Sequence, residues 1–181
     1  MDVFSHGLWA GAVYKALKLK TRKTFSVKWA VFWGVFPDLF AFAVPLLGLL
    51  WNLSFKGISL ADIPGPSTTE PPPQDSLWMF TLATALYNLS HSLIIFTVLF
   101  AIVYLIFRRP IWELGAWVLH IIIDVPTHSY EFYPTPLFWP ISSWKFDGFS
   151  WANPWFLLIN YAAILIVFLF LRAISRGGRQ P

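Results

Sequence analysis

The sequence contains no cysteine, which excludes disulfide bonds and thiolate metal sites throughout its 181 residues. Any bound metal ion must therefore be held by imidazole nitrogens and carboxylate oxygens. Charged residues are scarce as well: they make up 12% of the chain, against about 25% in an ordinary soluble domain. Because 57% of the residues are hydrophobic, long apolar segments replace the missing charges, and the composition predicts an integral membrane protein.

The net charge of +4 does not indicate binding to nucleic acid, because the basic residues gather beside apolar segments. All but Lys56 and Lys145 lie in residues 15–28, at Arg108 and Arg109, and in residues 172–179. Cations at the ends of apolar segments are topology signals, and the positive-inside rule places these groups, with the C-terminus, in the cytoplasm. We therefore expect a protein of the cytoplasmic (inner) membrane, surrounded by membrane lipids and without a nucleic-acid partner.

The apolar segments predict an all-α fold, in which residues 1–181 form a single membrane-embedded domain with about four transmembrane helices. The candidate spans are residues 29–51, 78–107, 111–125 and 154–171. Since about 20 apolar residues are needed to cross the hydrocarbon, the third is short and is expected to be tilted or buried. Residues 3–17 predict an amphipathic helix that lies at the interface or is partly inserted.

Two linkers are then expected outside the cytoplasm. Residues 52–77 are rich in proline, serine and threonine, and predict an extended loop. Residues 126–153 are rich in aromatic side chains and predict a lid on the membrane surface. Interfacial anchoring is the commoner role for such aromatics, and contact with a substrate is the alternative.

Ionisable groups are costly in hydrocarbon, so each one inside a predicted span is a functional hypothesis. None of the spans contains Lys or Arg, so no basic side chain within them can neutralise their acidic residues. Taken together, these groups favour a metal ion as the missing cation. They are Asp38, His91, His120 and Asp124 within the spans, His6 in the N-terminal segment, and His128 just after the third span.

Helical spacing singles out one pair among these residues. His120 and Asp124 are four residues apart, so on a helix their side chains share a face and can bind one ion. Pro126 disfavours helical geometry at Val125, so the helix is expected to end near Asp124. His128 would then follow a turn and could fold back over the same place.

Depth in the membrane links the other residues to this pair. Counted from the nearest cytoplasmic cation, His6, Asp38 and His120 lie nine, ten and eleven residues away, and His91 lies seventeen. At about 1.5 Å per residue, these offsets correspond to roughly 13 to 25 Å. The groups therefore form one layer, from the middle of the membrane into its outer half.

Neighbouring residues are expected to shape such a site. Thr84 and Asn88 share a helical face with His91 and predict hydrogen bonds that orient its imidazole. Pro37 is expected to kink the first span beside Asp38. For a single intramembrane histidine, a hydrogen bond between helices is the commoner role, and Glu113 is expected to interact with a helix dipole.

Several short motifs, occurring in order along the chain, resemble the YdjM-type family of inner-membrane proteins described as metal-dependent hydrolases. They are Met1-Asp2-Val3-Phe4-Ser5-His6-Gly7, Phe36-Pro37-Asp38, Leu89-Ser90-His91-Ser92, His120-Ile121-Ile122-Ile123-Asp124 and Phe138-Trp139-Pro140. The resemblance implies distant kinship with zinc-dependent phospholipases C and single-strand nucleases, which hold zinc through clustered His and Asp. It also implies a set of metal ligands, namely His6, Asp38, His91, His120 and Asp124, with His128 as an addition.

The sequence thus predicts a membrane-embedded, zinc-type hydrolase with one or two metal ions, acting on a phosphoester or lipid-like substrate. Asp124 or Asp38 is expected to bridge metal ions or to accept a proton as a catalytic group. The alternative is a non-enzymatic membrane protein whose cluster is a structural metal site or handles ions. A catalytically inactive scaffold is a third hypothesis.

Overall fold

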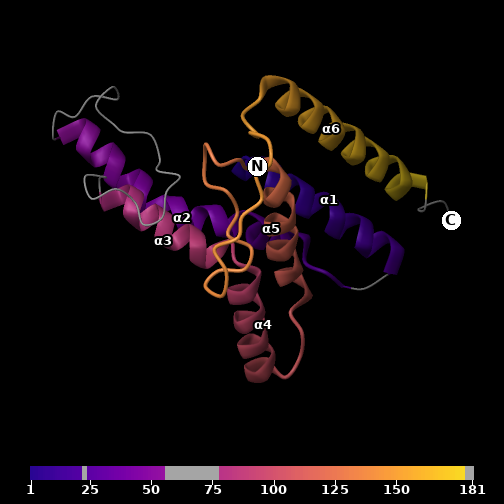
Figure 1. Cartoon of the computed structure of the whole chain (residues 1–181). Helices are drawn as coiled ribbons and strands as arrows, with labels where there is room; N and C mark the ends of the chain where they lie inside the picture. Colours follow the sequence, from indigo (N-terminus) through magenta and orange to yellow (C-terminus); the bar gives the residue numbers. More distant parts are fainter. Residues whose placement is uncertain (22–23, 56–77, 178–181) are drawn as a thin grey trace.

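The computed structural model describes residues 1–21, 24–55 and 78–177, and these residues contain helices and no β-strand (Figure 1). The predicted all-α class is confirmed. The Pro-rich linker falls mostly on residues 56–77, outside the described residues, while residues 52–55 continue the preceding helix. The elements in order are α1 (Val3–Thr21), α2 (Val27–Phe55), α3 (Trp78–Ser90), α4 (Leu93–Phe107), η2 (Trp112–Leu114), α5 (Gly115–Thr127) and α6 (Pro154–Gly177).

Two helices, α2 and α6, are long and apolar enough to cross a membrane. The pair α3 and α4 passes the same test when it is taken together, although the two helices meet at an angle of 60°. Helix α5 has 13 residues, fewer than the roughly 20 that a span needs. Among the described residues the structure therefore supports two spans, or three with the bent pair, and a count of four is not confirmed.

The second predicted span, residues 78–107, is broken where a straight helix was expected. Ser92 has extended backbone angles (φ −92°, ψ 126°), and its hydroxyl accepts hydrogen bonds from the amides of Ile94 and Ile95. A serine in this position is an N-cap, which satisfies amides that have no partner at the start of a helix. The break leaves His91 between α3 and α4 rather than on a continuous helix face.

Helix α1 does not bury the apolar stripe expected of an amphipathic helix. Its buried residues are mainly small or polar, among them Ser5, Gly7 and Ala10, whereas Phe4 and Leu8 are exposed. The small residues let α1 approach α2 closely, and α1 also packs along α6 (Figure 1). Apolar side chains facing outward are consistent with hydrocarbon around this helix.

Helix α5 continues beyond Asp124, through Pro126 to Thr127, so the expected helix end is wrong by three residues. The last carbonyls of the helix are satisfied by the loop that follows. The amides of Phe149 and Trp151 donate to the carbonyls of Pro126 and Thr127 at 3.0 and 3.1 Å. Because these long-range hydrogen bonds satisfy the last turn, it stays helical despite the proline. The loop thereby covers the end of α5.

Candidate metal centre

All six residues predicted for the site are buried together. Their exposed fractions lie between 0% and 4%, although they come from α1, α2, the break between α3 and α4, and α5 with its C-terminal cap. Figure 1 shows the N-terminus at the centre of the molecule beside α5, which agrees with the burial of Met1. The expected single layer is therefore one compact cluster in three dimensions.

Four of the six side chains form the core of the cluster. Single ligand atoms from Asp38, His91, His120 and Asp124 all lie within 4.8 Å of one another, so the group can hold a metal ion. Nε2 of His91 lies 3.0 Å from Nε2 of His120, 3.4 Å from Oδ2 of Asp124 and 3.5 Å from Oδ1 of Asp38. Nε2 of His120 lies 3.2 Å from Oδ2 of Asp124 and 3.7 Å from Oδ1 of Asp38.

These separations fit a tetrahedral ion. Bonds of about 2.0–2.2 Å to a tetrahedral zinc place neighbouring ligand atoms about 3.3–3.6 Å apart. The five separations above range from 3.0 to 3.7 Å, so five of the six edges of such a tetrahedron are close to their expected lengths, and the sixth, between Asp38 and Asp124, is within 4.8 Å. No large movement of any helix is needed to bind an ion there.

Backbone carbonyls set the direction of three imidazoles. Nδ1 of His120 lies 2.7 Å from the carbonyl oxygen of Gly34, and Nδ1 of His91 lies 3.2 Å from that of Tyr87. Nδ1 of His128 lies 2.9 Å from the carbonyl oxygen of Tyr133. A carbonyl accepts and cannot donate, so each Nδ1 carries the proton and each neutral ring keeps its lone pair on Nε2. All three lone pairs face the acidic cluster.

Asp124 stands between two groups of ligands. Its Oδ2 faces His91 and His120, as described above. Its Oδ1 lies 2.8 Å from Nε2 of His6 and 3.4 Å from Nε2 of His128, and it also contacts the α-amino nitrogen of Met1. The two oxygens of this one carboxylate thus face two separate sets of nitrogen atoms.

Two polar atoms in the cluster have no hydrogen-bond partner among the described residues. They are Nδ1 of His6 and Oδ2 of Asp124, and both side chains are almost completely buried. Buried polar atoms without partners are costly, and native proteins satisfy most of them. A cation held by Oδ2 of Asp124 and by the imidazoles of His91 and His120 that face it would satisfy this oxygen, which matches the donor set expected from the sequence.

Close packing of α1 on α2 brings His6 into this cluster. A methyl group added to Gly34 would lie 2.6 Å from Cβ of Ala10 and 3.2 Å from the carbonyl oxygen of His6. The absence of a side chain at Gly34 therefore lets the two backbones approach closely. His6 then stacks on His120, with ring centroids 3.6 Å apart. Gly34 has a second role, since its carbonyl orients His120.

Other residues near the site behave differently from expectation. The hydroxyl of Thr84 donates to the carbonyl of Phe80 at 2.9 Å rather than to an imidazole. The nearest hydroxyl to the His91 imidazole is instead that of Ser90, whose Oγ lies 2.9 Å from Nδ1 of His91. No pattern in the sequence assigned this role to Ser90. Glu113 lies in η2, directly before α5, and it also accepts a hydrogen bond from the amide of Ser26 at 2.8 Å, next to the start of α2.

An apolar cavity reaches the cluster from outside. Its volume is about 270 Å³, and two of the predicted ligands, Asp38 and His128, form part of its wall. The remaining wall consists of Met1, Asp2, Val3, Phe4, Phe42, Phe132 and Trp151. Burial raises the pKa of the Asp2 carboxyl, but hydrogen bonds from Ser5 and Tyr161 outweigh this effect, so its pKa lies below the ordinary value. The wall of the cavity thus includes an ionised carboxylate.

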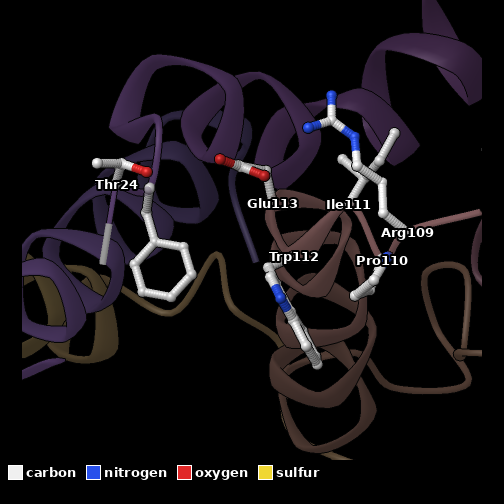
Figure 2. A pocket seen from close by; sticks show the side chains of 7 residues that line it. Thr24, Arg109, Pro110, Ile111, Trp112 and Glu113 are labelled. Carbon is white, nitrogen blue, oxygen red and sulfur yellow. The ribbon is translucent and has the colours of Figure 1, made fainter. Parts of the chain in front are cut away.

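A larger cavity, of about 620 Å³, lies elsewhere, where residues 24–25 meet residues 109–113. Figure 2 shows Arg109, Trp112 and Glu113 around it. None of the six predicted site residues lines this cavity, so cavity size alone does not mark the candidate metal centre.

Comparisons of the chain with protein-family models, with curated proteins and with solved structures found no match. The buried Asp and His side chains can hold a metal ion, and two helices, α6 and the α2 that carries Asp38, are long and apolar enough to cross a membrane.

Proposed function

We propose that the protein is a membrane-embedded, zinc-type hydrolase that acts on a phosphoester or lipid-like substrate. The observation that carries the proposal is the buried group of Asp38, His91, His120 and Asp124, whose ligand atoms lie within 4.8 Å of one another beside an open cavity. A set of imidazole and carboxylate ligands without thiolate suits zinc, and other divalent transition metals follow the same preference. The resemblance to YdjM-type proteins supports the same assignment.

The ligands divide into two sets around Asp124. His91 and His120, with Asp38, would hold one ion against Oδ2 of Asp124. His6 and His128 would hold a second ion at Oδ1, in place of the α-amino nitrogen of Met1, which contacts both Oδ1 and Nε2 of His128. A carboxylate that faces nitrogen ligands on both sides is the arrangement that a two-ion site needs.

The protein's own groups then have defined roles in hydrolysis. Bound zinc lowers the pKa of water to about 7 and stabilises charge on the attacked centre. Asp38 lines the cavity, and its carboxylate can accept the proton that water loses. In the overall reaction, one bond forms between the water oxygen and phosphorus, the bond to the leaving oxygen breaks, and that oxygen takes up a proton. The apolar wall excludes bulk water from the reacting group.

A structural metal site is the second candidate, and one observation favours it. Four protein ligands around one ion make a closed tetrahedron, which is typical of structural zinc, whereas catalytic sites keep one position open. The cavity beside Asp38 favours catalysis, because the least buried of the four core ligands lies on the wall from which a substrate would approach. Of the four core residues, Asp38 is therefore the one that water or a substrate in the cavity would meet.

The cellular setting follows from the charge pattern. With the basic groups in the cytoplasm, the protein would lie in the cytoplasmic membrane with its C-terminus inside. The cavity would then receive substrates that diffuse within the bilayer.

The proposal is tested by metal analysis and a substrate panel on purified protein in detergent. We expect stoichiometric metal in the wild type, and at least tenfold weaker metal binding in His120→Ala and Asp38→Ala. Phospholipid and phosphoester hydrolysis should disappear with a chelator and return with added zinc. Glu113→Gln is the matched control, because it removes a carboxylate outside the cluster and should leave both properties unchanged.

The outcomes separate the candidates. Active wild-type protein without stoichiometric metal would overturn the proposal. Stoichiometric metal without hydrolysis of any substrate in the panel would favour the structural site instead.

A further inference from the structure

A second apolar cavity lies between α2 and α3, beyond the one at the metal centre. Its volume is about 220 Å³. Its wall consists entirely of apolar and aromatic residues, namely Phe42, Pro45, Leu46, Leu49, Met79, Phe80, Ala83, Phe132 and Tyr133. It contains no residue of the proposed metal centre, and the chemistry described above does not use it.

The two cavities share part of their walls. Phe42 and Phe132 line both, so they separate neighbouring compartments along one face of the molecule. The compartment nearer the cluster is bounded by Asp38 and His128, and the farther one by hydrophobic side chains alone. A molecule that occupied both would place a polar group near the ligands and an apolar part away from them.

The surroundings indicate what such a molecule is. The farther cavity lies on α2, a helix long and apolar enough to cross a membrane, and its neighbours Leu47 and Leu50 are 66% and 50% exposed. Water is not a suitable occupant, because a buried water needs two to four polar partners. A hydrocarbon chain needs none, and the bilayer supplies it at this helix.

The volume of the farther cavity indicates how much of a molecule it can hold. A pocket for a whole small molecule usually encloses roughly 300–1,000 Å³, and the farther cavity falls below that range. It therefore suits part of a molecule, such as one segment of an acyl or isoprenoid chain. The cavity beside Asp38, on the other side of Phe42 and Phe132, provides room for the rest.

We propose that the cavity between α2 and α3 binds the hydrocarbon chain of a lipid whose ester group lies at the metal centre. The position of the ester rests on the hydrolase function proposed above, whereas the binding of the chain does not. The proposal narrows the substrate class to lipids and makes Leu46 and Leu49, on the wall of the cavity, chain-binding residues.

The test is photo-crosslinking with a phospholipid that carries a diazirine on one acyl chain, added below stoichiometry to the purified full-length protein. Adducts are mapped by mass spectrometry. We expect them on α2 and α3 residues of the cavity wall, with competition by excess unlabelled phospholipid. Leu46→Trp and Leu49→Trp each place a larger side chain on the wall of the cavity and should lower the crosslinking yield at least fivefold. Leu46 is 53% exposed, so Leu49→Trp is the stricter test of the two.

Leu47→Trp and Leu50→Trp are the matched controls, because they add the same side chain to the same helix outside the cavity. Circular dichroism and elution volume verify that all four variants fold. Equal yields in filled and control variants, or adducts spread evenly over the exposed apolar surface, would overturn the chain-binding site.

The readout needs no turnover, so it separates the two proposals. Specific crosslinking in a protein that hydrolyses no lipid supports the chain site and counts against the hydrolase. Hydrolysis of lipids with crosslinking unchanged in Leu46→Trp and Leu49→Trp supports the hydrolase and removes the chain site.

Discussion

Substitution of Gly34 by alanine tests whether the contact between α1 and α2 controls the metal centre. The added methyl group would lie 2.6 Å from Cβ of Ala10, whereas two carbon atoms in favourable contact are about 3.5–4.0 Å apart. Neither partner is the flexible end of a long side chain, so the two helices must separate by about 1 Å. His6, whose carbonyl oxygen is 3.2 Å from the same methyl position, would move with α1.

This displacement is large compared with what a metal site tolerates. Ligand distances in a working site lie within about 0.2 Å of their ideal values. The carbonyl of Gly34 also orients His120, so the substitution disturbs ligands on both sides of Asp124. We expect metal affinity to fall at least tenfold. Overpacking should also lower the free energy of unfolding by about 1–3 kcal/mol, which the better helix propensity of alanine offsets by up to about 1 kcal/mol.

Gly11→Ala is the matched control at the same interface. Its methyl group would meet Cγ2 of Val31 at 3.2 Å, a contact that a small side-chain shift relieves. Metal titration and metal analysis of both variants decide the matter. If Gly34→Ala binds metal as tightly as the wild type, or if Gly11→Ala loses as much affinity, the reasoning from helix approach is wrong.

Three further predictions concern the same site. Asp124→Asn should reduce the metal content more than Asp38→Asn, because Asp124 faces both ligand sets; the reverse order in metal analysis would contradict its bridging position. Acidification from about pH 7.5 to about pH 5 should release the metal reversibly, since protons compete for the imidazole nitrogens; occupancy that is constant over this interval would argue against histidine ligands. Gly148→Ala should lower the free energy of unfolding by about 1–3 kcal/mol, because its methyl group would lie 2.3 Å from the carbonyl oxygen of Pro126 and 2.6 Å from that of His128; thermal unfolding unchanged from the wild type would refute this.

Much of the candidate site could be predicted because its ligands are ionisable residues in an apolar chain. Asp38, His91, His120 and Asp124 each stand out from their neighbours, since hydrocarbon makes such groups costly. The groups that orient them do not stand out. The carbonyls of Gly34, Tyr87 and Tyr133 are backbone atoms, which every residue has, so no residue type marks them in a sequence.

The errors in the predicted elements have a common physical origin. Pro126 disfavours a helix locally, but hydrogen bonds from Phe149 and Trp151, more than twenty residues later, satisfy the last turn of α5. Ser92 looks like an ordinary polar residue within an apolar run, but as an N-cap it begins a new helix and turns the chain by 60°. At Pro126, contacts distant in sequence outweigh the preference of proline against helix. At Ser92, the capping geometry outweighs the tendency of the apolar run to form one continuous helix.

Composition and spacing therefore determine the class of this protein and the chemistry available to it. The scarcity of charge requires apolar helices, the absence of cysteine restricts the ligands to imidazole and carboxylate, and the four-residue spacing pairs His120 with Asp124. Tertiary structure alone decides that these ligands meet His6 and His128 on two sides of one carboxylate. The position of these ligands depends on distances of a few ångströms between helices. Close packing at Gly34 and the loop that covers the end of α5 set these distances, and no local sequence pattern encodes them.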